Sequence, residues 1–368
     1  MLAPNSDPGP ILHELALLPT ASFHEEQVGR YIRKLLTEHE IGFTVDPYGN
    51  TVAHYTLGDA PQPLALVAHM DHPAFEVASS QGEECEALLL GGVLTDYFAT
   101  STPVRVFTTA GTVAGQVRGI RSVPEQRQVV LSLRTAHPVA AGDWGVWEMA
   151  DFRQEGDLLH LRAADDLAGC AVVLSTLLSL QEHQVKGDVY GVFTRAEEVG
   201  LLGAILVAQQ RLLPGNTVVV SVESSRALPG AAVGEGPVVR VGDFRRTFHH
   251  EAEAFLLAGW EALRRSDPDV KVQRQLLSGG TCEATAFSLL GYRSTGVALP
   301  LGNYHNMGPN STLAPEFIHK GDLAGASALL TKAVEYARTP LRDPLLARYG
   351  QVSQEHQSRL QETAQHQG

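Results

Sequence analysis

The sequence predicts an α/β fold in which a mostly parallel sheet is flanked by helices and a small β-barrel-like domain is inserted. Three observations lead to this prediction. Strand and helix patterns alternate after residue 162, a buried strand pattern already stands before residue 73, and the segment between them is rich in short β runs. Alternating strands and helices are typical of a parallel sheet.

The first 73 residues predict helices followed by strands. Ser22 and Glu25 have the spacing of a capping box, which predicts a helix running to about Glu40. Residues 50–57 (NTVAHYTL) and 64–70 (LALVAHM) predict strands. The second is apolar at consecutive positions, as is typical of a strand that is buried on both faces.

Residues 74–161 have a different texture. Runs such as TPVRVFTTAGTVAGQVRGI and RQVVLSLRT are β-branched and broken by Gly and Pro, with little helical periodicity. We therefore expect an inserted β domain at 74–161, serving in oligomerisation or as a lid. The catalytic α/β unit then comprises 1–73 and 162–345, and residues 346–368 form a polar, Gln-rich tail.

Helical periodicity returns directly after the insert, and strand patterns alternate with it. The predicted helices are 165–183, 197–213, 250–266 and 321–337, and the predicted strands are 188–194, 216–222 and 294–300.

Composition limits the classes of function. The chain has 368 residues, of which 44% are hydrophobic and 19% charged, which predicts a globular protein without a membrane span. Its net charge of −13 argues against nucleic-acid and anionic-membrane partners. The 3 cysteines share no C-x-x-C spacing, and no signal peptide pattern stands at the start. We therefore expect a cytoplasmic protein without a thiolate zinc site.

Candidate metal ligands follow the apolar strand patterns. In an open α/β sheet, binding sites form beyond the carboxyl ends of the strands. Strands scattered through the sequence can therefore bring histidines and carboxylates to one edge. The candidates are His69 after LALVA, Glu197 and Glu198 after VYGVFTRA, Glu223 after TVVVSV, His305 shortly after STGVALP, and Asp165 and Asp166 at the start of a helix.

Each candidate also has an ordinary structural interpretation. His69 with Asp71 could open a co-catalytic zinc site or an iron oxygenase triad, or His69 could be a solvated strand end. Asp165 and Asp166 could cap a helix. Glu223 is harder to explain structurally, because a buried carboxylate without a partner is costly. A coincidence of all the ordinary interpretations is improbable.

At this point the motifs resemble a known family. AHMD, AADDLAG, RAEEVGLLGA, SVES, SGGTCEATAF and NYHN stand in the order found in co-catalytic zinc exopeptidases. The sequence is most similar to the tetrahedral (TET) aminopeptidases, which include glutamyl and deblocking aminopeptidases. The position of the β insert is similar as well, and the likeness extends to about residue 340.

The resemblance implies a dinuclear metal site and an aminopeptidase activity. Asp165 would bridge two divalent ions, most simply zinc, with cobalt or manganese as alternatives. The resemblance implies Glu197 as the general base and Asp71 as the group that orients the His69 ring. The other implied metal ligands are His69 and Glu223 for one ion and Glu198 and His305 for the other.

Departures from the family pattern leave substrate preference and assembly open. His72, Leu167, Glu223 and the Cys282-Glu283 pair stand where members usually carry other residues. The roles of Asp166 and of the turn at 279–281 (Gly-Gly-Thr) also stay open.

The expected partners are peptide substrates and further copies of the chain, from a dimer up to a dodecamer. Alternatives remain. They are a metallo-carboxypeptidase or N-acyl amino-acid amidohydrolase, a non-catalytic metal-binding relative, and a mononuclear iron oxygenase. An insert that precedes Asp165 and is rich in β patterns favours the aminopeptidase.

Overall fold

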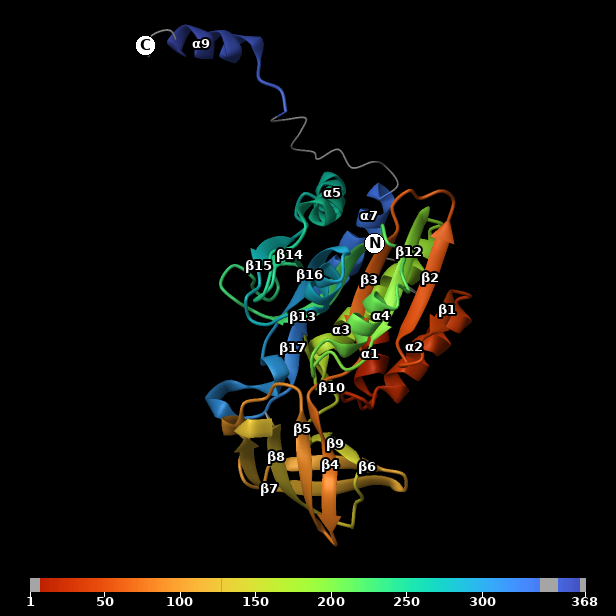
Figure 1. The fold of residues 1–368 in the computed structure, drawn as a ribbon, viewed down its shortest axis with the longest axis vertical. Helices are drawn as coiled ribbons and strands as arrows, with labels where there is room; N and C mark the ends of the chain where they lie inside the picture. The colour runs from red at the N-terminus through yellow and green to blue at the C-terminus, as the bar shows by residue number, and fades with distance from the viewer. Residues whose placement is uncertain (1–6, 127, 338–349, 365–368) are drawn as a thin grey trace.

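The computed structural model describes residues 7–126, 128–337 and 350–364. Figure 1 shows an α/β unit above a small β-barrel. The predicted fold class, a mostly parallel sheet flanked by helices with an inserted barrel, is confirmed. Parts of the predicted catalytic unit and tail, residues 1–6, 338–349 and 365–368, lie outside the described residues.

The central sheet has 8 strands in the order β1-β2-β12-β3-β13-β16-β14-β15. Its middle strands β12, β3, β13 and β16 run parallel to one another, whereas β2 and β14 pair antiparallel with their inner neighbours. The carboxyl ends of the middle strands therefore meet at one edge. The strands are β1 (Gly42–Val45), β2 (Thr51–Leu57), β3 (Leu64–His69), β12 (Gly187–Thr194), β13 (Val218–Arg226), β14 (Val238–Gly242), β15 (Gln273–Leu276) and β16 (Arg293–Leu301).

Both faces of the sheet are covered by helices, which explains the continuous apolar pattern of β3. Leu64, Leu66 and Ala68 face the larger core, while Ala65 and Val67 face the smaller one. The larger core includes residues of α1 (Pro8–Ala16), α2 (Glu26–Glu38), α3 (Ala164–Glu182), α5 (His250–Ser266) and α7 (Lys320–Tyr336), and the smaller includes α4 (Leu202–Gln209) and α6 (Glu283–Leu289).

Helix α3 is the central helix of the larger core. It is the one helix in the described ranges whose length and apolar composition would suffice to cross a membrane, and 94% of that apolar window is buried inside the protein. Its burial within the α/β unit accounts for its hydropathy.

The inserted segment contains a closed antiparallel barrel with the strand order β4-β5-β8-β7-β6-β9. Phe75, Val106, Leu131, Leu133 and Trp147 are among the buried residues of its own core. Its strands are β4 (Ala74–Gln81), β5 (Glu84–Leu90), β6 (Pro103–Thr108), β7 (Gly111–Val123), β8 (Gln128–Thr135) and β9 (Trp144–Trp147).

The last part of the predicted insert pairs with the α/β unit. Strands β10 (Phe152–Glu155) and β11 (Leu158–Leu161) form a separate sheet with β17 (Glu316–His319). Near the C-terminus, the exposed helix α9 (Gln354–Ala364) lies within the segment predicted as a polar tail.

The predicted capping box of α2 is wrong. The helix begins after Glu25, and no side chain caps it. The Ser22 hydroxyl instead donates to Asp71 Oδ2 at 2.6 Å, and Glu25 accepts from the Phe23 and Ala196 N–H groups. Ser22 therefore has a charged acceptor in the fold, and charged acceptors form stronger hydrogen bonds than neutral ones.

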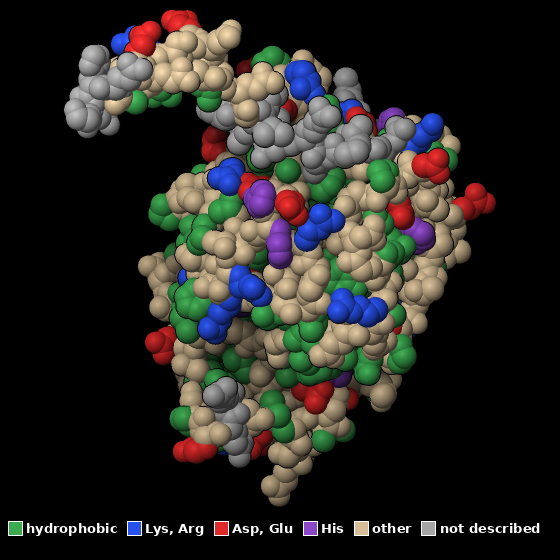
Figure 2. Space-filling model, turned by 45° about the horizontal axis from the view of Figure 1, so that its top comes forward, with side chains coloured by type: hydrophobic (Ala, Val, Ile, Leu, Met, Phe, Trp, Pro, Cys, Tyr) green, Lys and Arg blue, Asp and Glu red, His purple; other side chains and the backbone are tan. Residues whose placement is uncertain are grey.

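The molecular surface mixes charges of both signs. On the face drawn in Figure 2, Lys and Arg side chains lie interspersed with Asp and Glu, with hydrophobic side chains between them.

Candidate metal centre

Adjacent parallel strands bring the first predicted ligands together. Val67 of β3 pairs with Ser221 of β13, so His69 and Glu223 stand side by side two residues further along. His69 Nε2 lies 3.3 Å from Glu223 Oε1. Asp165, at the start of α3, places its Oδ1 atom 3.2 Å from the same nitrogen. These three residues form a buried group that could hold a cation.

A second group shares Asp165. His305 Nε2 lies 3.6 Å from Asp165 Oδ2 and 3.2 Å from Glu198 Oε1. The ligand atoms of Asp165, Glu198 and His305 all lie within 4.8 Å of one another. The Asp165 carboxylate thus has one oxygen near each histidine.

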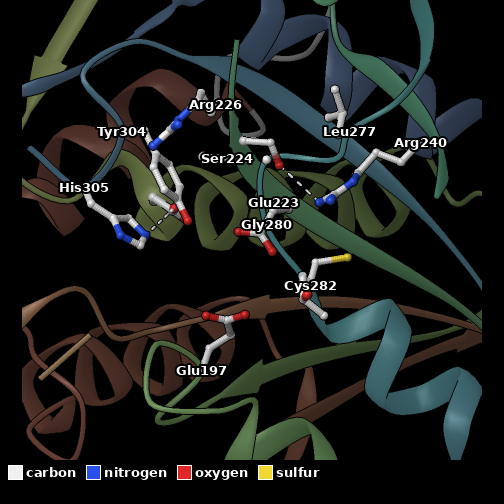
Figure 3. A pocket seen from close by; sticks show the side chains of 14 residues that line it. Glu197, Glu223, Ser224, Arg226, Arg240, Leu277, Gly280, Cys282, Tyr304 and His305 are labelled. Carbon is white, nitrogen blue, oxygen red and sulfur yellow. Dashed lines mark hydrogen bonds and ion pairs between the residues drawn. The ribbon is translucent and has the colours of Figure 1, made fainter. Parts of the chain in front are cut away.

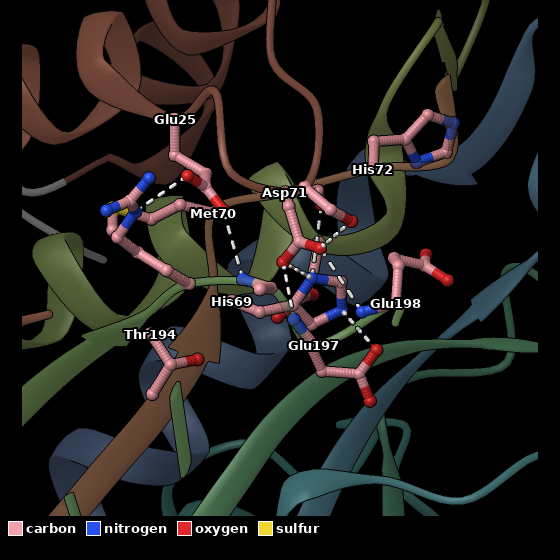
Figure 4. Close-up of polar contacts among 12 residues, drawn as sticks. Glu25, His69, Met70, Asp71, His72, Thr194, Glu197 and Glu198 are labelled. Carbon is pink, nitrogen blue, oxygen red and sulfur yellow. Dashed lines mark hydrogen bonds and ion pairs between the residues drawn. The ribbon is translucent and has the colours of Figure 1, made fainter. Parts of the chain in front are cut away.

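Glu197 and Asp71 lie next to these groups (Figure 4). Glu197 Oε2 is 3.9 Å from His69 Nε2. The Asp71 carboxylate accepts the backbone N–H of Glu197 at 2.9 Å and that of Glu198 at 3.2 Å, besides the Ser22 hydroxyl. Asp71 therefore holds the backbone of both glutamates.

Both histidines turn Nε2 toward the carboxylates and Nδ1 toward a carbonyl oxygen. His69 Nδ1 lies 3.1 Å from the Asp71 carbonyl oxygen and 3.5 Å from the Asp71 carboxylate. His305 Nδ1 lies 2.6 Å from the carbonyl oxygen of Gly92, in the barrel. An Nδ1–H that donates to these oxygens leaves a lone pair on Nε2, directed at Asp165 and its neighbours.

The residues present fit divalent cations. Buried oxygens of Asp165, Glu198 and Glu223 make no hydrogen bond. Burial and the charge of Glu223 raise the pKa of Asp165 to about 8. Burial would lower the pKa of His305, but Glu198 and Asp165 raise it to about 9. In the absence of a cation, protons must therefore offset the crowded carboxylates, and bound metal ions would replace them.

Two further buried groups support the cluster: Glu316, which the sequence analysis missed, and His72, whose role it left open. Glu316 is fully buried, and its two oxygens accept the backbone N–H groups of Asp165 at 2.9 Å and His305 at 2.7 Å. His72 Nδ1 donates to the Asp165 carbonyl at 2.6 Å. Glu316 stands in a short strand after a proline, so no local pattern distinguishes it from an ordinary acidic residue.

Two further buried carboxylates lie behind the cluster. Asp166 accepts the Gly169 N–H at 3.1 Å and thus caps the regular part of α3. Glu283 accepts a short hydrogen bond from the Thr194 hydroxyl, and burial raises its pKa to about 8.

A small pocket with a cavity volume of about 40 Å³ opens beside the cluster (Figure 3). Glu197 and Glu223 face each other across it, and Tyr304 and His305 stand at one side. The predicted turn at 279–281 and Cys282 form part of its wall. A substrate in this pocket would therefore contact the carboxylate cluster directly.

Two arginines line the same pocket. Arg226 holds its guanidinium 4.9 Å above the Tyr304 ring. Arg240 is 2% exposed, and its guanidinium donates to Ser225 Oγ at 3.1 Å, while its Nε makes no hydrogen bond. Within the described ranges no carboxylate pairs with Arg240 at 4.0 Å or less. Burial would lower the pKa of Arg240, but neighbouring groups including Cys282, Glu223 and Asp243 raise it, so the guanidinium stays charged. Its Nε–H, which makes no hydrogen bond, could receive an anion.

Sequence comparison connects this chain to peptidases. The sequence model described as M42 glutamyl aminopeptidase matches residues 134–316, a stretch that contains the predicted ligands other than His69. A protein of Acetivibrio thermocellus, provisionally named an aminopeptidase, is 26% identical over 187 residues. That match covers 49% of this chain and 52% of the relative, so the chain spans about half the length of the curated relative it matches.

Solved structures share the fold. An aminopeptidase of the archaeon Desulfurococcus kamchatkensis has a TM-score of 0.74 and 22% identity, over 91% of this chain and 96% of that one. The TET1 peptidase of Pyrococcus horikoshii, which can assemble into a tetrahedron or a large octahedral shell, has a TM-score of 0.72 and 20% identity, over 88% and 98%. Yeast aminopeptidase 1 has a TM-score of 0.64 and 12% identity, over 91% and 98%.

The resemblance predicted from the motifs is thereby confirmed: this chain is similar to the M42 peptidases in sequence over residues 134–316 and in fold over most of its length.

Proposed function

We propose that this chain is a metal-dependent aminopeptidase that removes N-terminal residues from peptides. The observation that carries the proposal is the pair of buried His–carboxylate groups that share Asp165. Oxygens of these groups lack hydrogen bonds and lie beside a pocket at the edge of the sheet. The peptidase names of the similar proteins support the same activity.

The proposed centre holds two divalent ions per chain. His69, Asp165 and Glu223 would bind one, and Asp165, Glu198 and His305 the other. Nitrogen and oxygen donors of this kind suit zinc, with cobalt or manganese as alternatives. When bound, such ions polarise the scissile carbonyl and lower the pKa of a coordinated water to about 7.

Glu197 is the proposed general base. Its carboxylate takes a proton from the attacking water as the oxygen adds to the carbonyl carbon. It then gives that proton to the departing nitrogen as the C–N bond breaks. Burial and its acidic neighbours raise the pKa of Glu197 in the metal-free protein, although His69 lowers it. Asp71 supports this role by holding the Glu197 backbone.

The pocket favours substrates with an acidic first residue. The free amine would lie at the carboxylate cluster, and the side chain would extend toward Arg240, with Arg226 at the pocket wall. The buried and nearly unpartnered Arg240 guanidinium would gain a charge-assisted hydrogen bond from a carboxylate. The glutamyl specificity in the family's description agrees with this substrate class.

A matched substrate pair tests this preference. Glutamyl and glutaminyl anilides differ by one charge, so we expect the glutamyl compound to have the higher kcat/KM. Arg240→Met should reduce the ratio by about 10- to 100-fold, the worth of one charge-assisted hydrogen bond. Arg211→Met is the control, because Arg211 lies over Tyr292 and outside this pocket. An unchanged ratio in Arg240→Met would exclude Arg240 as the group that recognises an acidic first residue.

The second candidate is a metallo-carboxypeptidase or N-acyl amino-acid amidohydrolase with the same ligands. In that reaction, the anionic group bound by Arg240 would be the substrate's own α-carboxylate. The β-barrel that precedes Asp165 favours the aminopeptidase, because an insert in the second class is expected to be α+β and to come later in the chain.

The first experiment measures bound metal together with turnover. Aminoacyl and N-acylated substrates are assayed with the wild type and with Glu197→Gln. We expect two metals per chain in both proteins and loss of aminoacyl turnover by about 10²- to 10⁴-fold in the variant. Turnover of N-acylated substrates alone would favour the second candidate, and one iron without peptide turnover would exclude both.

The assembly and location of the protein are part of the proposal. We propose 1–73 and 162–345 as the catalytic unit and 74–161 as an insert that serves in oligomerisation or as a lid. The oligomeric relatives support a homo-oligomer, and the three free, buried cysteines are consistent with a cytoplasmic setting.

A further inference from the structure

The two histidines of the centre depend on different parts of the molecule. His69 ends a buried strand, and its Nδ1 partner Asp71 is two residues away. His305 lies in a loop after β16, with a backbone φ of +54°. A positive φ is unfavourable for a residue with a side chain and persists where surrounding contacts hold it. The contacts around His305 therefore decide its position.

The barrel supplies one of these contacts. Gly92 lies in the loop between β5 and β6, and its carbonyl oxygen is 2.6 Å from His305 Nδ1. This contact spans more than two hundred positions in the sequence. It fixes both the ring orientation and the tautomer, which leaves Nε2 free to face Asp165 and Glu198.

The loop that carries His305 also rests on the barrel core. Met307 and Leu313 are partly buried against the barrel's hydrophobic cluster. On the other side of the loop, Glu316 and Asn306 connect it to the α/β unit, since Asn306 Nδ2 donates to the Arg162 carbonyl at 2.8 Å. His305 thus lies between the two units and contacts both.

The barrel is itself attached to the α/β unit by polar contacts. His24 stacks on Trp144 and lies 2.7 Å from Glu76, both barrel residues. Buried Arg162 lies 2.5 Å from Asp151, just beyond the last barrel strand. These contacts set the position of the barrel, and with it the position of the Gly92 carbonyl.

We propose that the barrel is a structural part of the metal centre. Gly92 is a positioning residue for His305, so metal retention at Asp165, Glu198 and His305 depends on the docked barrel, whereas the His69 and Glu223 group does not. The proposal rests on the ligand assignment above, but it concerns metal binding and not turnover.

Replacement of a single backbone amide by an ester tests the Gly92 contact. Incorporation of the α-hydroxy acid analogue of valine at position 93 converts the Gly92 carbonyl into an ester carbonyl, a weaker acceptor of the same shape. We expect one of two zinc ions to bind about 10- to 100-fold more weakly, as for other groups that orient metal ligands. The control ester replaces the preceding peptide bond, between residues 91 and 92. It leaves the Gly92 carbonyl an amide and should leave both zinc affinities unchanged.

Two methionines on the same barrel cluster provide an independent test. Met307 and Met149 are both partly buried there, but Met307 alone lies on the His305 loop. Met307→Ala should weaken the binding of one of the two zinc ions and shift the NMR resonances of the His305 ring nitrogens. Met149→Ala should leave both readouts as in the wild type.

The outcomes separate this proposal from the proposed function. Equal zinc affinities in the Gly92 ester and the native chain would overturn it, and so would an equal loss in both methionine variants. Selective loss of one zinc ion would support it even if no peptide were hydrolysed. Two tightly bound ions without any peptidase turnover would count against the proposed function alone.

Discussion

The two halves of the candidate centre are built in different ways. His69 and Glu223 come from neighbouring strands whose backbone hydrogen bonds set their spacing. His305 and Glu198 come from loops and reach their positions through contacts with Gly92, Glu316 and Asp71. A sheet edge therefore determines the first half, whereas the second half requires several units of the molecule to be in place.

Removal of the shared ligand should give the largest effect. Asp165→Asn deprives both halves of a negative charge, and we expect loss of both zinc ions and of turnover by about 10³-fold or more. Elemental analysis and kcat/KM measure this outcome. Asp188→Asn, a strand residue paired with His54 on the protein surface, is the control. Retention of one tightly bound ion in Asp165→Asn would contradict the shared role.

Metal binding should release protons from both halves, since burial lowers but carboxylates such as Glu197 raise the pKa of His69 as well. Raised pKa values of about 8 for Asp165 and about 9 for His305 mean that the metal-free protein binds protons at these groups at pH 7. Metal binding expels protons, so the apparent zinc affinity should rise with pH by up to about 10-fold per unit and per proton.

Calorimetry in buffers of different ionisation enthalpy measures the number of protons released. His305→Gln should release fewer than the wild type, because it removes one of the protonated groups. Heats that do not depend on the buffer would show that no proton is displaced.

A smaller effect is expected for Ser22, which supports the His69 side of the centre through Asp71. Ser22→Ala removes the hydroxyl that donates to Asp71 at 2.6 Å in a buried site. The free energy of unfolding should fall by about 1–3 kcal/mol. Chemical denaturation of the metal-free protein measures it. Ser80→Ala, on an exposed part of a barrel strand, is the control and should be near neutral.

The smallest effect is expected at the contact of His24 with Glu76 of the barrel. His24 and Glu76 are 17% and 37% exposed, so His24→Gln should cost about 1 kcal/mol or less in unfolding free energy. Zinc affinity should also be unchanged, because Arg162 and the Met307 contact still hold the barrel. Loss of zinc in this variant would show that the barrel is held more weakly than its contacts indicate.

Much of the fold and of the cluster could be predicted from the sequence. Apolar runs such as LALVA identify buried strands, and polar residues directly after them fall at the edge where ligands gather. His69, Glu198 and Glu223 follow this rule. The structure brings these residues together with Asp165 and His305.

Other features had no local signal. Ser22 and Glu25 matched a capping box, yet Ser22 bonds to Asp71, 49 positions away. Glu316 supports Asp165 from 151 positions away. Pattern rules describe neighbours in sequence, so they do not detect partners of this kind.

The sequence by itself determined the alternation of strands and helices, the inserted barrel and the residues that we propose carry the chemistry, because periodicity and residue type are local properties. Only the tertiary structure decided which oxygen faces each histidine, that a barrel carbonyl contacts His305, and that Arg240 lies buried beside the cluster with a hydrogen bond to Ser225. These features arise from the packing of segments far apart in the chain, where distance and burial set the energy of each contact.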